Sequence, residues 1–572
     1  MLGFLVGCST IPEPKPFHTE ADKYAYVKEY MRWYIKEQME EKGLVGLSVA
    51  LVDDQKIVWS EGFGYADREN KIKATPQTRY RAGSITKLFT DMAVMKLAEE
   101  GKVNIDKPFK TYLPEFSIKS RFGSTDSITP RNIMTHHSGL PGDWLDRMFA
   151  SNPLPYTEHV KVIKNDYMAY KPNTIFSYSN LAITLLGHSI ENVSGMKYAK
   201  YVDNVLLTPI GMQHSDLEMA LKGEHASKSY TKEKLTNELA IGEVPAGALN
   251  TSVVDLAHLA MMINAHGKYR DHQVLKRTTL KKMFTVQNKS VALDVGTEIG
   301  LGYFIDSTLL GKKDTVYSHG GNTIAQNDYF CVSPYSKLGV VVMSNNAGID
   351  AMDIANKLLT KAWEAKTGKK VEKKKTTRAN ASDFEGIYAT MVGKVKMQKE
   401  RDDTYIAYMD SGTFKLSKTK KGTYKLKYKL LGLIPISNDE LDEVELYTDD
   451  IEGNHVIVAV MKGNTFIAGV KVDKPTNIPL AWKNYVGHYK ILNKLEPKKL
   501  KIEDVEFTIE EGYPLIKTKF KSGQTLTMIL KPINDTEAII EGLGRSMQET
   551  IYMKDGLFHH AGLRFEKIKG KK

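Results

Sequence analysis

The spacing of apolar residues changes along the chain and predicts regions of different structure. Residues 20–42 carry apolar side chains at helical spacing among Lys and Glu, which predicts an amphipathic helix ending near Gly43. The apolar runs at residues 45–52 and 57–63 predict two strands separated by a short turn. Residues 88–98 again predict a helix, after which loops rich in Pro and Gly alternate with helical segments to about residue 300.

Strand character returns between residues 316 and 345, and a last helix is expected over residues 350–367. Strands therefore lie at both ends of this region, with a largely helical insertion between them. This pattern predicts a mixed α/β (α+β) domain whose sheet joins the early and late parts of the chain. Cys331 lies in an apolar run and is expected to be a buried strand residue rather than a nucleophile.

The last third of the chain has the short alternating segments and turns of all-β structure. It also contains an internal repeat: residues 384–388 match residues 485–489, and residues 461–466 resemble residues 553–558. We interpret this repeat as two similar barrel-like modules, each long enough for about eight short antiparallel strands that close and hide their edges. The alternative is one larger sandwich with a coincidental likeness of turns.

The amino-acid composition mainly excludes certain classes of protein and kinds of site. Hydrophobic residues make up 42% and charged residues 26% of the chain, which indicates a globular protein. Two cysteines exclude a disulfide scaffold and a four-cysteine zinc site. The net charge of +12 is spread over 572 residues, so no nucleic-acid partner is expected. The predicted divisions are an N-terminal segment (1–19), an α/β domain (20–368), a charged linker (369–380) and two β modules (381–474 and 475–572).

The N-terminus resembles a bacterial lipobox, because Leu5, Val6 and Gly7 precede Cys8 and three prolines follow. Only seven residues precede Cys8, and none is basic, whereas a working signal peptide has a basic start and a longer apolar stretch. Either this start is truncated or the likeness is coincidental. We take Cys8 as a lipidation candidate and expect a cell-envelope or periplasmic protein. A lipid on Cys8 would attach this protein to a membrane. The alternative is a frayed apolar terminus.

Three short segments carry candidate chemistry. Ser84 and Lys87 are one turn apart at the start of an apolar helix, where a lysine of lowered pKa can accept a hydroxyl proton. The bare Ser-x-x-Lys spacing is weak evidence, since an N-cap serine beside a solvated lysine has the same spacing. Tyr178 and Asn180 precede a helical run, and a phenol there acts as a base only if cations stabilise its charge. The alternative is a buried tyrosine followed by a capping asparagine.

The third segment, His319-Gly320-Gly321-Asn322, begins beside a strand. Its two glycines let a ligand lie against the backbone and use the backbone N–H groups. A plain turn at a strand end would have the same pattern.

Taken together and in this order, the three segments resemble the serine β-lactamase and penicillin-binding-protein superfamily. The similarity is to its branch of class C β-lactamases, DD-carboxypeptidases, family VIII carboxylesterases and D-aminopeptidases. Three flanking segments, at residues 129–141, 245–256 and 341–346, resemble stretches of the same family. The likeness covers about residues 40–365 and implies an antiparallel sheet with a helical region.

The resemblance also implies roles. Ser84 would be the nucleophile, Lys87 and Tyr178 would share general acid and base work, and Asn180 would position the substrate and Lys87. The backbone N–H groups of Ser84 and Asn322 would form the oxyanion hole, and no metal or cofactor would be needed. The adjacent His136 and His137 fall in a segment that the family uses as a structural turn, so we expect them to be structural.

Departures from the family pattern limit the substrate. His319 stands where β-lactamases have a lysine, and Gly320 stands where they have a threonine hydroxyl. A histidine offers less permanent charge, which weakens the case for β-lactams and for peptides ending in a carboxylate. Esters, amides and peptides with an N-terminal D-residue remain open. We expect a serine hydrolase; the alternatives are a penicillin-binding receptor with little turnover, or a protein that binds a small ligand in its β modules.

The tandem β modules resemble the lipocalin-like barrels that follow this domain in some members of the superfamily. In that arrangement a barrel can approach the cleft and limit substrate size. We therefore expect removal of residues 371–572 to change the substrate range rather than to abolish acylation, if the first domain folds alone.

Overall fold

The computed structural model describes residues 12–311, 313–371, 383–400, 403–430, 434–436, 444–461, 464–494 and 502–570. Cys8 and residues 372–380 of the predicted linker lie outside these ranges. Within them, no helix is long and apolar enough to cross a membrane.

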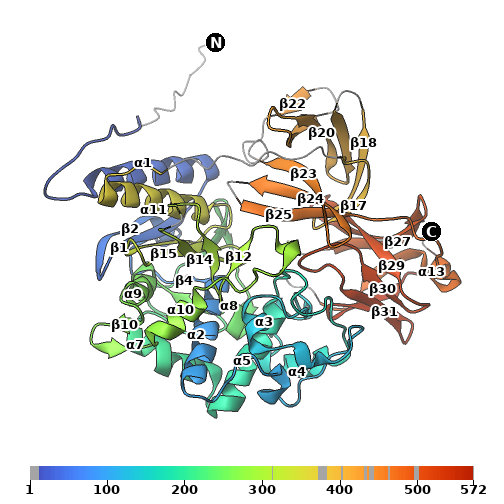
Figure 1. The fold of residues 1–572 in the computed structure, drawn as a ribbon, viewed down its shortest axis with the longest axis horizontal. Helices are drawn as coiled ribbons and strands as arrows, with labels where there is room; N and C mark the ends of the chain where they lie inside the picture. Colours follow the sequence, from blue (N-terminus) through green and yellow to red (C-terminus); the bar gives the residue numbers. More distant parts are fainter. Residues whose placement is uncertain are drawn as a thin grey trace.

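The first domain is built on one antiparallel sheet of eight strands that joins the two ends of this region of the chain (Figure 1). Strand β1 lies centrally and pairs with β2 on one side and with the late strand β16 on the other. The expected junction of early and late chain is thus present. In spatial order the strands are β12 (Glu298–Ile299), β13 (Phe304–Asp306), β14 (Val316–Asn322), β15 (Asn327–Ser333), β16 (Leu338–Ser344), β1 (Gly46–Asp53), β2 (Lys56–Asp67) and β3 (Ile72–Lys73).

Both faces of this sheet are covered, which explains why β1 and β16 are continuously apolar. Leu47, Val49 and Leu51 point into the core beneath the helices α1 (Ala25–Lys42) and α11 (Ala351–Thr367), which lie side by side in Figure 1. Ala50 and Val52, which alternate with them, point into the larger core on the opposite face. The sheet is therefore an interior wall of the domain.

The larger core holds the helical region between the early and late strands. Helix α2 begins directly after the turn that carries Ser84 and is buried along most of its length. It packs against α5 and α8, and α9 packs on β16. The helices of this region are α2 (Thr86–Glu99), α3 (Pro130–Met134), α4 (His159–Ile163), α5 (Asn180–Ser194), α6 (Tyr198–Val202), α7 (Thr208–Ile210), α8 (Val244–Gly247), α9 (Val253–Asn264) and α10 (Arg277–Met283).

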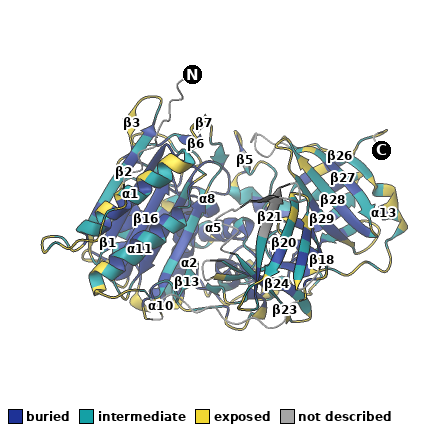
Figure 2. Ribbon diagram, turned by 90° about the horizontal axis from the view of Figure 1, so that it is seen from above, coloured by how far each residue is buried: buried dark blue, intermediate teal, exposed yellow. Residues whose placement is uncertain are grey.

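Two closed eight-stranded barrels follow, which confirms the predicted all-β modules; Figure 2 shows them beside the first domain. In module 1 the pairing of β20 with β21 closes the ring, and β22 (Ile434–Ile436) is an extra strand at its edge. The ring strands are β17 (Gly386–Thr390), β18 (Gly393–Lys399), β19 (Thr404–Met409), β20 (Gly412–Lys418), β21 (Tyr424–Leu430), β23 (Glu445–Ile451), β24 (Asn454–Met461) and β25 (Asn464–Lys471).

Module 2 begins with a short helix that packs against its barrel. Trp482 of α13 (Leu480–Tyr485) is fully buried, stacks near Phe507 and Phe558, and donates its indole N–H to the carbonyl of Asn534 at 2.6 Å. The ring strands are β26 (Gly487–Ile491), β27 (Ile502–Glu510), β28 (Tyr513–Phe520), β29 (Thr525–Pro532), β30 (Glu537–Ile540), β31 (Thr550–Lys554), β32 (Leu557–His560) and β33 (Leu563–Lys567).

The sequence repeat marks equivalent places in the two barrels. Gly386 and Gly487 open the first strand of each module with φ angles of 143° and 141°. A Cβ atom at either glycine would lie within 3 Å of a lysine side chain on the last strand of its module, Lys471 of β25 or Lys567 of β33. The positive φ angle favours glycine at this place in each barrel, where the first strand pairs with the last.

Module 2 is docked on the first domain through polar contacts. Arg121 forms an ion pair with Glu537 at 2.8 Å, and the backbone N–H of Leu145 donates to the carbonyl of Ala561 at 2.8 Å. The loop that follows β30 reaches deeper, since the N–H of Gly142 donates to Glu549 at 2.8 Å. The second barrel is therefore in direct contact with the segment around residue 142.

We expect Trp482→Ala to destabilise module 2 by about 3–5 kcal/mol, because it removes a fully buried indole from the barrel. Hydrogen exchange should show lost protection in β26–β33 and unchanged protection in β1 and β16. Leu480→Ala is the matched control, since Leu480 lies in the same helix but is 71% exposed. Equal effects of the two substitutions would contradict this description of the barrel.

Candidate active site

Ser84 lies at a sharp turn between β4 (Tyr80–Arg81) and α2. The turn is a 3-10 helix, Gly83–Ile85, in which Gly83 has a φ of 50°. A Cβ atom at Gly83 would lie 2.9 Å from the backbone nitrogen of Asn322, so glycine lets this turn approach β14 closely. The backbone of Ser84 is thereby held beside that of Asn322, as an oxyanion hole requires.

Lys87 lies one helical turn after Ser84 and is 1% exposed. Its Nζ donates to Ser84 Oγ at 3.0 Å and to the carbonyl of Ala246 at 2.6 Å. Burial lowers the pKa of Lys87 to about 7, and the positive charge of Arg545 contributes to the lowering. A large fraction of this amine is neutral near pH 7 and can accept a proton from the adjacent hydroxyl.

Tyr178 precedes the first turn of α5, where the side chain of Ser179 caps the helix. Its hydroxyl is hydrogen-bonded with Ser84, and its ring packs on His136 with centroids 4.2 Å apart. Burial raises the pKa of Tyr178, although Ser84 and the charge of Arg545 act in the opposite direction. Tyr178 is therefore a protonated phenol at neutral pH and suits the role of proton donor.

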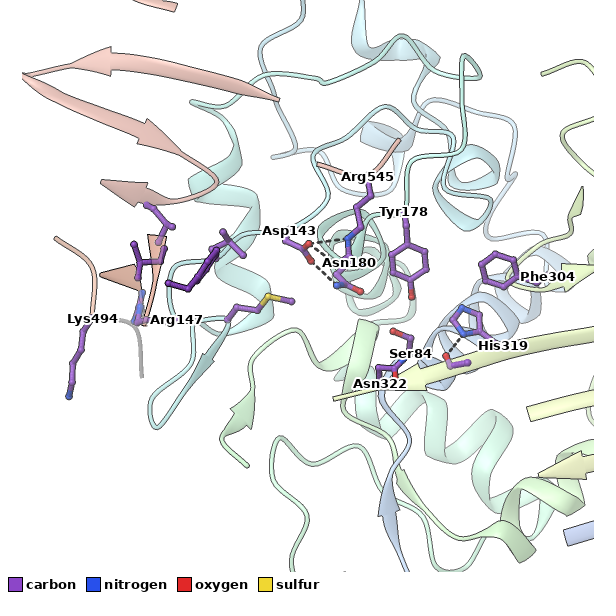
Figure 3. A pocket seen from close by; sticks show the side chains of 16 residues that line it. Ser84, Asp143, Arg147, Tyr178, Asn180, Phe304, His319, Asn322, Lys494 and Arg545 are labelled. Carbon is purple, nitrogen blue, oxygen red and sulfur yellow. Dashed lines mark hydrogen bonds and ion pairs between the residues drawn. The ribbon is translucent and has the colours of Figure 1, made fainter. Parts of the chain in front are cut away.

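The segment His319-Gly320-Gly321-Asn322 forms the end of β14 and faces Ser84 (Figure 3). A Cβ atom at Gly321 would lie 2.0 Å from the carbonyl oxygen of Ala82, so this position also requires glycine. Burial and the nearby Lys87 lower the pKa of His319 to about 3. His319 is thus neutral at physiological pH, and because Nδ1 lies 2.6 Å from the carbonyl of Gly320, Nδ1 carries the hydrogen and Nε2 is left as an acceptor.

Asn180 interacts with a charged pair rather than with Lys87. Its side-chain amide donates to Asp143 at 2.7 Å, and the guanidinium of Arg545 donates to the other oxygen of Asp143 at 2.7 Å (Figure 3). Arg545 belongs to module 2, and its guanidinium lies 5.1 Å from the ring centre of Tyr178. The second barrel therefore places a permanent cation beside the predicted catalytic groups.

These residues surround a cavity of about 660 Å³ between the first domain and module 2. Ser84, Tyr178, Asn180 and His319 line its inner end, whereas Arg147 and Lys494 lie at the far end in Figure 3. Most other lining side chains are apolar and come from both domains: Leu145, Met148, Phe304, Ile502, Phe520 and Leu563. The cavity that Ser84 borders is therefore lined by the second barrel as well as by the first domain.

The structure brings together Ser84, Lys87, Tyr178 and the segment 319–322. It also reveals three neighbouring charged residues that the motifs did not identify: Asp143, Glu243 and Arg545. Asp143 lies just after residues 129–141, and Glu243 lies just before residues 245–256. Both segments resemble stretches of the family. Arg545 had no comparable signal, because only the docking of the two domains places it here.

The remaining candidates have structural contacts. His136 accepts a hydrogen bond from the N–H of Ser179 at 3.2 Å, and His137 is paired with Asp294 at 2.8 Å. Cys331 is fully buried in β15, and burial raises the pKa of its thiol. In the part of the chain that the structure describes, no three His, Cys, Asp or Glu side chains form a cluster that could hold a metal ion.

Similarity to known proteins agrees with this geometry. The family model described as Beta-lactamase matches residues 31–362. Protein flp of Staphylococcus aureus strain N315 is 27% identical over 319 residues, which are 54% of this chain and 61% of that protein. Beta-lactamase-like protein 2 of Dictyostelium discoideum is 28% identical over 239 residues, which are 38% of this chain and 40% of that protein. The chain thus spans about three fifths of the first of these relatives and less of the second.

Among solved structures, the octameric penicillin-binding protein homologue from Pyrococcus abyssi is 26% identical with a TM-score of 0.52, and the match covers 76% of this chain and 99% of that one. The crystal structure of SurE with D-Leu has a TM-score of 0.57 over 78% of this chain and 99% of that one; at 18% identity it supports the fold alone. Because the family model matches more than half of the chain, and its range includes Ser84, Lys87, Tyr178 and His319, this protein belongs to the Beta-lactamase family.

Proposed function

We propose that this protein is a serine hydrolase that forms an acyl-enzyme on Ser84 and hydrolyses an amide or an ester. The observation that carries the proposal is the buried amine of Lys87, 3.0 Å from the hydroxyl of Ser84. A serine hydroxyl is a weak nucleophile unless a base lies within hydrogen-bonding distance. With its pKa lowered to about 7 by burial, Lys87 meets that requirement at neutral pH.

In the proposed acylation step, neutral Lys87 takes the proton of Ser84 as Oγ attacks the substrate carbonyl. The developing oxyanion lies against the backbone N–H groups of Ser84 and Asn322. Gly83 and Gly321 let the two segments that carry these groups pack closely. Tyr178 then protonates the leaving group and regains a proton from Lys87. The protonated phenol of Tyr178 can donate this proton, and Lys87, which is neutral in about half of the molecules near pH 7, can accept the proton of Ser84.

The charges in the cavity favour a peptidase- or esterase-like activity over an efficient β-lactamase. A neutral His319 provides no cation for a substrate carboxylate, and Gly320 provides no hydroxyl. Arg545 is a cation near Ser84, but Asp143 already binds it through two hydrogen bonds. An acyl group without a free carboxylate, packed on the apolar wall, fits these groups best.

The interior of module 2 argues against a small ligand inside that barrel. The space among its aromatic side chains, including Phe507 and Phe558, is about 10 Å³, which is too small for an organic molecule. The other alternative, a penicillin-binding receptor with little turnover, shares the acylation step and differs only in the fate of the acyl-enzyme. We keep the envelope location as part of the proposal, with Cys8 as the site of lipid attachment.

Replacement of Ser84 by Ala should abolish covalent labelling and lower turnover by on the order of 10⁴-fold or more, since it removes the nucleophile. Intact-protein mass spectrometry after exposure to p-nitrophenyl butyrate, a D-alanyl amide and a fluorescent penicillin measures this. A wild-type adduct that decays as product appears supports the hydrolase. A permanent adduct with penicillin alone favours the receptor, and labelling that persists in Ser84→Ala contradicts the assignment.

The rate of acylation should rise with pH through about 7, because the base form of Lys87 is the neutral amine. Arg545→Gln removes a positive charge that lowers this pKa, so the midpoint should move to higher pH, by on the order of one pH unit. Burst kinetics with p-nitrophenyl butyrate between pH 5 and 10 measure the midpoint.

Arg147→Gln is the matched control for this experiment. Arg147 also lines the cavity, but it lies at the far end and is not among the groups that shift the pKa of Lys87. Its midpoint should remain that of the wild type. An unchanged midpoint in Arg545→Gln would show that module 2 does not tune the base.

A further inference from the structure

A second, smaller cavity lies beside Ser84, next to the large one. Its volume is about 40 Å³, which is enough for a water molecule. It shares Ser84, Met148, Asn180 and Asn322 with the large cavity, and its other lining residues include Gly83, Ala246 and Glu243. Ser84 and Asn322 thus border both the space for the acyl donor and a second chamber of molecular-water size.

Glu243 is 2% exposed, and its Oε1 has no hydrogen-bond partner among the described residues. Glu243 lies just before α8, but its side chain does not cap that helix. The nearest basic group is His159, whose Nε2 lies 3.7 Å from Oε1, too far for a hydrogen bond. Since His159 Nδ1 lies 3.2 Å from the carbonyl of Tyr156, Nδ1 carries the hydrogen, and the neutral ring has none to offer from Nε2.

A buried carboxyl oxygen without a partner costs free energy, so its presence needs an explanation. No part of the acylation step described above uses Glu243. Glu243 and Ser84 both line the chamber, so a water held there would lie between this side chain and the acyl group on Ser84. We propose that Glu243 binds and activates the water that hydrolyses the acyl-enzyme; this inference rests on the proposed serine hydrolase.

The proposed step is balanced within the site. The Glu243 carboxylate takes one proton from the water as the water oxygen bonds to the acyl carbon. The bond between that carbon and Ser84 Oγ then breaks, and Tyr178 gives its proton to Oγ. The product acid leaves with the second proton of the water, and the proton on Glu243 passes through neutral Lys87 to Tyr178, which returns all three groups to their starting states.

The groups that face Glu243 determine the pH at which its side chain becomes a carboxylate. Burial raises its pKa to about 8, and the negative charge of Asp143 contributes, whereas Lys87 and Arg545 oppose the increase. His159 is itself neutral there, because burial lowers its pKa to about 4. The carboxylate fraction therefore grows as the pH rises through 8, and hydrolysis of the acyl-enzyme should grow with it.

The test compares wild type and Glu243→Gln in stopped-flow burst kinetics with p-nitrophenyl butyrate. The amide keeps the shape of the side chain but cannot act as a base. We expect a burst of about one p-nitrophenolate per protein in the variant, a steady-state rate lower by about 10²–10⁴-fold, and a butyryl adduct on Ser84 in the mass spectrum. The rise of the wild-type rate through pH 8 should be absent.

Two further variants separate this role from a structural one. Glu243→Asp keeps a carboxylate and should recover part of the steady-state rate. Glu541→Gln is the matched control: it also removes a carboxyl of raised pKa that is half-buried, but Glu541 lines neither cavity, and its hydrolysis rate should stay within about threefold of wild type.

The burst amplitude counts folded, reactive sites, so a partly unfolded variant does not obscure the result. Wild-type-like steady-state turnover in Glu243→Gln would overturn this inference and leave the proposed function intact. A variant without a burst would also overturn it, because Glu243 would then act before deacylation. A wild type with neither burst nor turnover, and with no adduct from the other donors, would refute the proposed function itself.

Discussion

The side chain of Lys87 is removed from water, and the arrangement of the site depends on this burial. An ammonium group is costly to bury without strong partners, so the side chain loses its proton at a much lower pH than an exposed lysine does. The two oxygens that it contacts, on Ser84 and Ala246, orient the amine without fixing a full positive charge on it. The same burial that makes this position unfavourable for a cation makes it suitable for a base.

The charge balance around this amine extends across a domain boundary. Arg545 lowers the pKa of Lys87, and the acids Glu243, Asp143 and Asp91 raise it. Asp143 holds Arg545 in place through two hydrogen bonds, so the loop of module 2 is part of the electrostatic environment of Ser84. The second barrel is therefore more than an appended domain: it supplies part of the cavity's apolar wall and contributes to the pKa of Lys87.

The sequence predicted the strands and barrels, which depend on local residue patterns. It predicted little of what depends on how module 2 docks on the first domain. The apolar runs around Leu51 and Val340 predicted the joined sheet, because a strand buried on both faces has few polar positions. The repeat at Gly386 and Gly487 predicted two barrels, because ring closure constrains the same backbone position twice. Arg545 could not be predicted in this way, since it reaches Asp143 from 402 residues further along the chain. The sequence also suggested a histidine titrating near neutrality at position 319, whereas its full burial keeps it uncharged.

The proposed mechanism depends most directly on the protonation state of one amine. NMR of the protein with ¹³C- and ¹⁵N-labelled lysine, titrated from pH 5 to 11 and compared with Lys87→Arg to assign the signal, measures it. The mechanism predicts that the Lys87 signal titrates near pH 7, well below the other lysines. A Lys87 signal that titrates above pH 10 with the exposed lysines would mean that this amine stays charged at neutral pH and is not the base.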